Sequence, residues 1–250
     1  MIQTRDKTLF LAWQNKEARK WYPIGRMEHR ASSGIYRFQY IRGAVDASEN
    51  AGFKPLFEFP DLYEQYESTE LFPLLQTRLF PKSRGDFHTH LEQLDLTEDA
   101  EAFDILEVDG GYRATDSFHV FPLLKGQDKQ SFTCRFFLHG FRHITDSAQK
   151  RIGKLNAGEE LGLAMELANP ETTIGIQIQS KDYEMLGWAP RYLRNDLQAA
   201  ICNKPEQIRA HVVRLNPEPA PIKQRLLVAI QGAWPDGHVP MSTPRFDPLP

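Results

Sequence analysis

The apolar residues of this chain come in short runs, and this feature constrains the fold most. A run such as Ile35–Tyr40 alternates with period two, which is typical of a half-buried β-strand. No apolar run approaches the roughly 20 residues that a bilayer-spanning helix needs. The sequence therefore predicts an α+β protein built largely from short strands. Its 250 residues allow one large domain or two small ones.

Residues 1–125 are expected to form an antiparallel sheet with helices. The expected strands are 8–13, 21–25, 35–40 and 117–122. A short helix is expected around residues 70–75, with Pro73 in its first turn, where a missing N–H costs nothing. Phe87, Leu91 and Leu94 share one helical face, so a helix is also expected over 87–96.

Residues 130–233 are expected to form a small barrel-like β domain with inserted helices. The expected strands are 132–138, 161–167, 173–178, 185–189, 211–215 and 226–230. A helix is predicted over 145–155, with Asp146 as its N-cap and Gln149 completing a capping box. A second helix is predicted to begin at Pro190.

Two polar or proline-rich segments bound these regions. Residues 124–130 contain Gly126 between apolar segments and indicate a linker. Residues 234–250 carry five prolines after Trp234 and form a tail that is either a disordered end or an extended arm packed on the domain.

Charge is distributed unevenly along the chain. Residues 1–129 hold 16 Lys+Arg and 21 Asp+Glu, a balance of −5, whereas the remainder holds 14 and 12, a balance of +2. This excess is too small to indicate nucleic-acid binding by itself. The N-terminus lacks an apolar signal core, and two cysteines make no disulfide framework, so we expect a cytoplasmic protein.

The motifs of common enzyme classes are missing. The sequence has no GxxxxGK[ST], no GxGxxG and no GxSxG. Nothing near Cys134 or Cys202 would lower the pKa of a thiol, so neither is expected to be a nucleophile. We therefore expect a binding protein without a cofactor and not an enzyme.

Two histidine pairs leave a metal enzyme as a minor alternative. His88 and His90 would point the same way only on a strand, and the helical spacing around them argues against that. His139 and His143 have no third ligand close in sequence.

Three short motifs in the second half carry the most information. They are Gly140-Phe141-Arg142-His143, Asn169-Pro170 and Gly187-Trp188-Ala189-Pro190-Arg191. Their order and spacing resemble the HIRAN domain, a small module found beside DNA-repair helicases and alone in bacteria. The resemblance covers about residues 132–203.

The resemblance implies an OB-like barrel that binds single-stranded DNA and captures a 3′ end. It implies phosphate contact by Arg142, stacking by His143 and Trp188, and a basic contact from Arg191, with Asn169 in the motif's turn. Planar rings stack on any base, and arginine stays charged beside phosphate. Basic residues that could extend the groove are Lys150, Arg151, Lys154 and Arg194.

The sequence also departs from the HIRAN pattern at the turn. Glu171 and Thr172 replace the usual Tyr-Asp, and Ile174 replaces a second Asn. Glu171 would place a negative charge where a phosphate or a terminal hydroxyl would lie. End recognition is the property that this departure weakens.

The first half is similar to the N-terminal subdomain of HipA-type toxin kinases. The similarity lies in Trp13, Gly25, residues 36–40, residues 71–73 and residues 78–81. It implies an interaction module that docks another protein. The sequence thus predicts a DNA-binding module joined to a docking module. The alternative is a protein–protein adaptor or antitoxin-like regulator that binds no nucleic acid.

Overall fold

A computed structural model describes residues 6–124 and 130–250. The chain divides into two compact units. Unit 1 contains residues up to 87, residues 98–123 and residues 241–250, and unit 2 contains residues 88–97 and 124–240. Both hold antiparallel sheets and helices, which confirms the α+β class. Residues 125–129 of the predicted linker lie outside the described residues.

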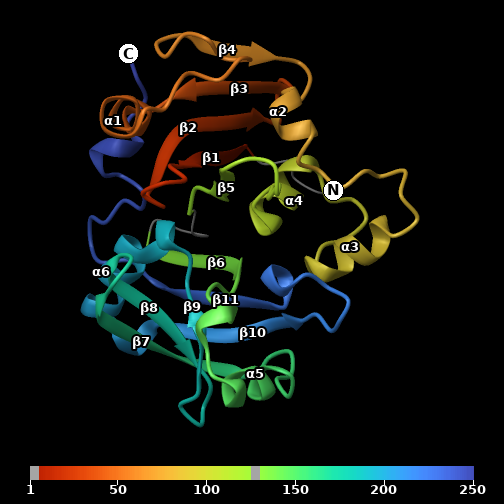
Figure 1. Cartoon of the computed structure of the whole chain (residues 1–250), viewed down its shortest axis with the longest axis vertical. Helices are drawn as coiled ribbons and strands as arrows, with labels where there is room; N and C mark the ends of the chain where they lie inside the picture. The colour runs from red at the N-terminus through yellow and green to blue at the C-terminus, as the bar shows by residue number, and fades with distance from the viewer. Residues whose placement is uncertain (1–5, 125–129) are drawn as a thin grey trace. The chain divides into compact units, whose positions relative to one another are not determined.

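Unit 1 is built on a five-stranded antiparallel sheet in the order β4-β3-β2-β1-β5 (Figure 1). Its strands are β1 (Lys7–Gln14), β2 (Trp21–Arg30), β3 (Ile35–Tyr40), β4 (Gln65–Ser68) and β5 (Phe118–Pro122). The predicted strands are therefore confirmed, with β4 in addition. The helices are α1 (Arg42–Ala51), α2 (Pro73–Gln76) and α4 (Ala102–Asp109).

The core of unit 1 is aromatic and tied to the backbone. Phe38 and Phe59 stack with ring centroids 3.9 Å apart. The Tyr40 hydroxyl donates to the carbonyl of Phe59 at 2.8 Å, and the amide of Leu56 donates to that hydroxyl at 2.7 Å. These bonds fix the turn at residues 56–59 against the sheet, because each buried polar group finds its partner there.

The end of the chain is part of unit 1. The amide of Arg42 donates to the carbonyl of Asp247 at 2.9 Å, and the amide of Leu249 donates to the carbonyl of Tyr40 at 3.2 Å. Residues 241–250 are thus an extended arm held by backbone hydrogen bonds. Of the two expectations for the proline-rich tail, a disordered end and an extended arm packed on the domain, these residues follow the second.

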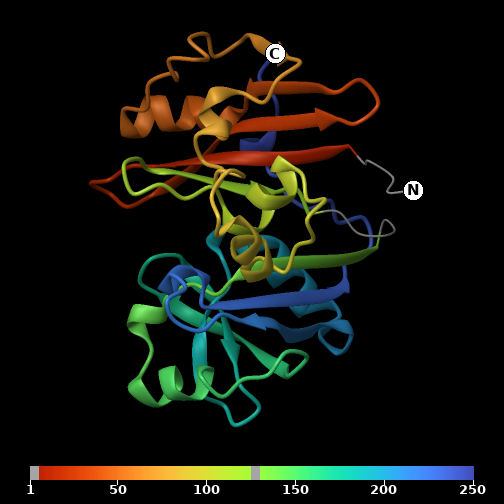
Figure 2. The same cartoon turned by 90° about the vertical axis from the view of Figure 1, so that its right-hand side faces the viewer.

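Unit 2 is built on a six-stranded antiparallel sheet in the order β6-β11-β10-β7-β8-β9. Its strands are β6 (Ser131–Phe137), β7 (Glu160–Asn169), β8 (Thr173–Gln179), β9 (Met185–Trp188), β10 (Arg209–Leu215) and β11 (Leu226–Ala233). Figure 1 shows β7 and β8 running obliquely to β10 and β11, and Figure 2 shows the same unit from the side. The order ends at β6 and β9, so a closed barrel is not shown.

Helices and single turns complete unit 2. The helices are α3 (Phe87–Gln93), α5 (Asp146–Ile152) and α6 (Arg194–Asn203), and the 3₁₀ turns are η1 (Phe141–His143), η2 (Arg191–Leu193), η3 (Pro205–Gln207) and η4 (Ile222–Gln224). A further turn, η5 (Pro244–Phe246), belongs to unit 1. Over residues 6–124 and 130–250, none of the helices has the length and apolar content that crossing a bilayer requires.

The predicted N-cap of α5 is wrong by one residue. Thr145 is the N-cap, and its hydroxyl accepts from the amide of Ala148 at 3.2 Å. Asp146 is the first helical residue instead. Its carboxylate still favours the helix start electrostatically, because the N-terminal end carries partial positive charge.

Candidate nucleic-acid interface

The first and third sequence motifs meet at one short backbone pairing. His139 and Trp188 exchange two hydrogen bonds, each 3.0 Å from amide nitrogen to carbonyl oxygen. This bridge joins the chain just beyond β6 to the end of β9. We call the four residues His139, Gly140, Gly187 and Trp188 the Trp188 seam. It brings together residues that are about 50 positions apart in sequence.

Both glycines of the seam are required by close approach. A Cβ on Gly187 would lie 2.5 Å from the carbonyl oxygen of His139. A Cβ on Gly140 would lie 2.2 Å from Cε3 of Trp188, and Gly140 has a φ of +83°. Side chains cannot occupy such space, and the left-handed backbone disfavours them further. The glycines in the two motifs therefore have a packing role.

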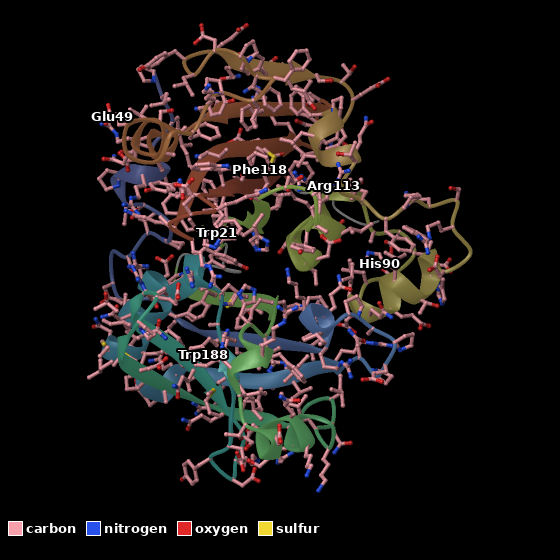
Figure 3. All side chains as sticks on the ribbon, viewed as in Figure 1. Trp21, Glu49, His90, Arg113, Phe118 and Trp188 are labelled. Atoms are coloured by element: carbon pink, nitrogen blue, oxygen red, sulfur yellow. The ribbon has the colours of Figure 1, made fainter. Side chains whose placement is uncertain are left out.

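The indole of Trp188 is held by its own neighbours. Its Nε1 donates to Oε2 of Glu166 at 2.6 Å, and it lies close to Gly140 and Gly175. The ring is partly buried, and Figure 3 labels it on β9. Hydrogen bonds from the side-chain amide of Asn169 and from this indole lower the pKa of Glu166, so its carboxylate stays charged near neutral pH.

The second motif is linked to the seam through Glu166. Nδ2 of Asn169 donates to Oε2 of Glu166 at 2.7 Å. Oδ1 of Asn169 accepts from the amides of Glu171 and Thr172, both at 3.1 Å. Asn169 therefore shapes the β7–β8 turn, as Asx residues commonly do. All three motifs lie in one connected structure, although Glu166 belongs to none of them.

The predicted basic residues differ in what they contact. Arg142 and His143 are exposed on η1, and no side-chain partner of Arg142 is found among the described residues. Arg191 forms an ion pair with Glu171, with Nη2 and Oε2 3.0 Å apart. Glu171, the acidic residue that departs from the HIRAN pattern, therefore lies against this arginine. Arg194 donates to the carbonyl of Thr172 at 2.6 Å and helps to hold the turn.

Lys150 lies in a groove beside η1. The groove has a volume of about 470 Å³ and is lined by Phe141, Asp146, Gln149, Lys150, Glu218, Ile222 and Arg225. Phe141 and Ile222 give it an apolar surface next to the basic side chains. Asp146 and Glu218, which also line the groove, offset the positive charge of Lys150 and Arg225. Nη2 of Arg225 lies 3.7 Å from Oε1 of Glu218. Sequence analysis missed residues 218–225, whose only signal is the apolar–basic pattern Ile222-Lys223-Gln224-Arg225.

The histidines of the metal alternative lie in two separate places. On α3, His88 is exposed and pairs with Glu92 at 3.2 Å, whereas His90 is buried. His143 is the last residue of η1, and His139 lies two residues before η1 begins. Within the described ranges, no group of three or more His, Cys, Asp or Glu side chains could hold a metal ion.

Comparisons with known proteins leave the family open. No protein-family model matches the chain, and no curated protein matches it. A crystal structure of a protein from Lactobacillus plantarum aligns with a TM-score of 0.32 and 18% identity, covering 45% of this chain and 96% of that one. This likeness carries no argument about fold or function. The HIRAN and HipA resemblances therefore remain predictions.

Proposed function

We propose that unit 2 is a non-enzymatic module that binds single-stranded DNA, and that its six strands form an OB-like barrel closed at the Trp188 seam. The observation that carries the proposal is the convergence of three motifs at the His139–Trp188 bridge. The resemblance to the HIRAN domain predicts that these motifs act together, and the bridge between the two ends of the strand order supports closure.

In this proposal the exposed basic residues contact phosphates and the rings contact bases. Arg142 is the primary phosphate contact because no acidic partner holds it among the described residues. Lys150 and the groove beside η1 continue the path. Trp188 and His143 provide stacking surfaces, since stacking on aromatic rings tolerates any base. Arg191 contributes less, because Glu171 neutralises it.

We also propose that unit 1 docks a partner protein, as its HipA-like pattern predicts, and that the protein acts in the cytoplasm. The alternative, an adaptor without nucleic-acid binding, is favoured by one observation: Glu166, Glu171, Asp146 and Glu218 all lie at or near the proposed path. The two functions make opposite predictions for DNA affinity.

Fluorescence anisotropy with a labelled oligo(dT) of about 16 nucleotides, the upper site size of one OB-like module, tests the proposal. We expect binding that weakens steeply with salt, with a slope of about −0.7 per phosphate neutralised. Arg142→Ala should reduce affinity, and Arg142→Ala combined with Trp188→Ala should abolish it.

Lys181→Ala is the control, because Lys181 is an exposed cation in the β8–β9 turn and pairs with Glu160 of β7. It should bind as the wild type does. Absence of binding at low salt, or equal losses in Arg142→Ala and Lys181→Ala, would favour the adaptor.

A further inference from the structure

The segment 57–70 of unit 1 combines exposed aromatic rings with a high density of negative charge. Phe57 is 100% exposed and Tyr63 is 62% exposed. The segment holds five acidic residues and no Lys or Arg; these are Glu58, Asp61, Glu64, Glu67 and Glu70. These five negative charges account for the whole net charge of −5 over residues 1–129, which hold 16 Lys and Arg and 21 Asp and Glu. The other residues of that part of the chain carry no net charge.

The exposure of Phe57 has no local explanation. Leu56 and Phe59 on either side of it pair through a backbone bridge, and Phe59 is 1% exposed. The turn is therefore fixed, and it presents Phe57 to solvent while it buries Phe59. A large apolar side chain fully in water, on a rigid turn, is typical of an interaction site when it lies beside other recognition features.

The neighbouring strand offers such a feature. β4 is an end strand of the unit 1 sheet, and among the described residues no strand pairs with its outer edge (Figure 1). Phe59 packs against Tyr66 of β4 with ring centroids 5.1 Å apart, and the amide of Asp61 donates to the Tyr66 hydroxyl at 2.8 Å. The turn and the strand thus form one surface.

We propose that this surface, which we call the acidic edge, binds an extended basic segment of a partner protein that adds a strand to β4. The acidic edge consists of β4 with Phe57, Tyr63, Glu64, Glu67 and Glu70. Backbone amides of the added strand pair with β4, and its Lys or Arg side chains contact the carboxylates and the rings. The inference rests on the proposed docking role of unit 1.

The negative charge of the acidic edge favours a basic segment over a nucleic acid, an anionic lipid surface or a second copy of the chain. A nucleic acid or an anionic lipid surface is repelled by the carboxylates. A second copy pairing β4 with β4 would bring Glu64 and Glu67 of both copies together, which is unfavourable. A basic segment gains from the same charges, even though Glu67 already pairs with Arg37 at 2.5 Å.

The test uses the full chain and a dye-labelled probe, a blocked peptide of alternating Lys and Val of about six residues, the usual strand length. We expect binding by anisotropy that weakens with salt. Binding should also slow hydrogen exchange at Gln65–Ser68. A peptide with Glu in place of Lys should not bind.

Two pairs of variants locate the site. Phe57→Ser should weaken binding about five-fold, the range of one aromatic contact, whereas Tyr112→Ser, at another exposed aromatic of unit 1, should not change it. Glu64→Gln with Glu70→Gln should weaken binding, and Glu17→Gln with Glu49→Gln, which removes two exposed charges elsewhere, should not. Equal effects within either pair would overturn the proposal.

N-methylated probes test strand addition at unchanged charge. In an added strand, alternate backbone amides face β4 and the others face away from it. Methyl groups on the first set should abolish binding, and methyl groups on the second set should leave it intact. Binding that survives both would overturn the proposal. The oligo(dT) affinity of the Phe57→Ser protein should equal that of the wild type, so loss of DNA binding and loss of peptide binding are separate results.

Discussion

The Trp188 seam in unit 2 and the acidic edge in unit 1 place aromatic side chains in opposite situations. At the seam, the indole is bonded to Glu166 and packed beside two glycines of its own module. At the acidic edge, Phe57 contributes nothing to the core and is fully exposed. The comparison shows that a sequence motif can be explained by internal packing, whereas an aromatic residue that internal packing does not explain is the better indicator of a partner.

The largest expected effect tests the turn at the acidic edge. Phe59→Ala should cost about 3–5 kcal/mol of unfolding free energy, because it removes a buried ring that stacks on Phe38. Phe57→Ala should change that free energy by less than about 0.5 kcal/mol, as an exposed substitution does. Urea denaturation measures both. A large cost at Phe57 would mean that its ring is part of the fold, and the comparison would fail.

The next effect tests the packing at the seam. Gly140→Ala and Gly158→Ala introduce the same Cβ at nearly the same φ, +83° and +81°. Only Gly140 has a neighbour within 4 Å, Cε3 of Trp188 at 2.2 Å. Gly140→Ala should therefore be less stable than Gly158→Ala by about 1–3 kcal/mol, the cost of overpacking.

Equal unfolding free energies for these two variants would mean that the indole is free to move away. The Trp188 indole would then be loosely packed at the seam, and it would resemble the exposed Phe57 ring of the acidic edge.

A smaller effect concerns the charge that holds the indole. Glu166→Gln keeps an acceptor but loses the charged hydrogen bonds, which should cost about 1 kcal/mol near neutral pH. Because the pKa of Glu166 is lowered in the folded protein, its contribution is present above the ordinary value of 4.5 and is lost as the pH falls through the lower folded value.

The stability difference between the wild type and Glu166→Gln should therefore shrink below pH 4.5. Urea denaturation at several pH values measures it. A difference that is unchanged in acid would show that the charge of Glu166 does not hold Trp188.

The sequence predicts the strongly patterned parts of this fold and misses the weakly patterned ones. Strand β3 begins and ends where its alternation does, at Ile35 and Tyr40. Helix α1 is missed because it buries Gly43, Ala44 and Ala47, small residues that give no apolar period. Their size matters for another reason, since a Cβ on Gly43 would lie 1.9 Å from the carbonyl oxygen of Pro23.

The candidate site follows the same rule. Gly140, Asn169, Gly187 and Trp188 are visible as motifs, and the structure connects them. Glu166 is not visible, because its position opposite Gly175 depends on the register of β7 and β8. β4 is missed as well: it is short and polar, and its pairing with β3 is set by contacts far away in sequence.

The smallest stability effect gives the sharpest test of function at the seam. The pair of Arg191 and Glu171 is exposed by 41% and 52%, so Glu171→Gln should change the unfolding free energy by less than about 0.5 kcal/mol. If phosphate binds beside Arg191, the same variant removes this ion pair and a repulsive negative charge, so oligo(dT) affinity should rise about three-fold or more. Glu160→Gln is the control, since Glu160 forms a surface ion pair with Lys181 that is even more exposed, at 68% and 64%. An equal rise in both variants would reflect net charge alone, and no rise in Glu171→Gln would mean that phosphate does not bind beside Arg191; either result would remove Arg191 from the DNA site.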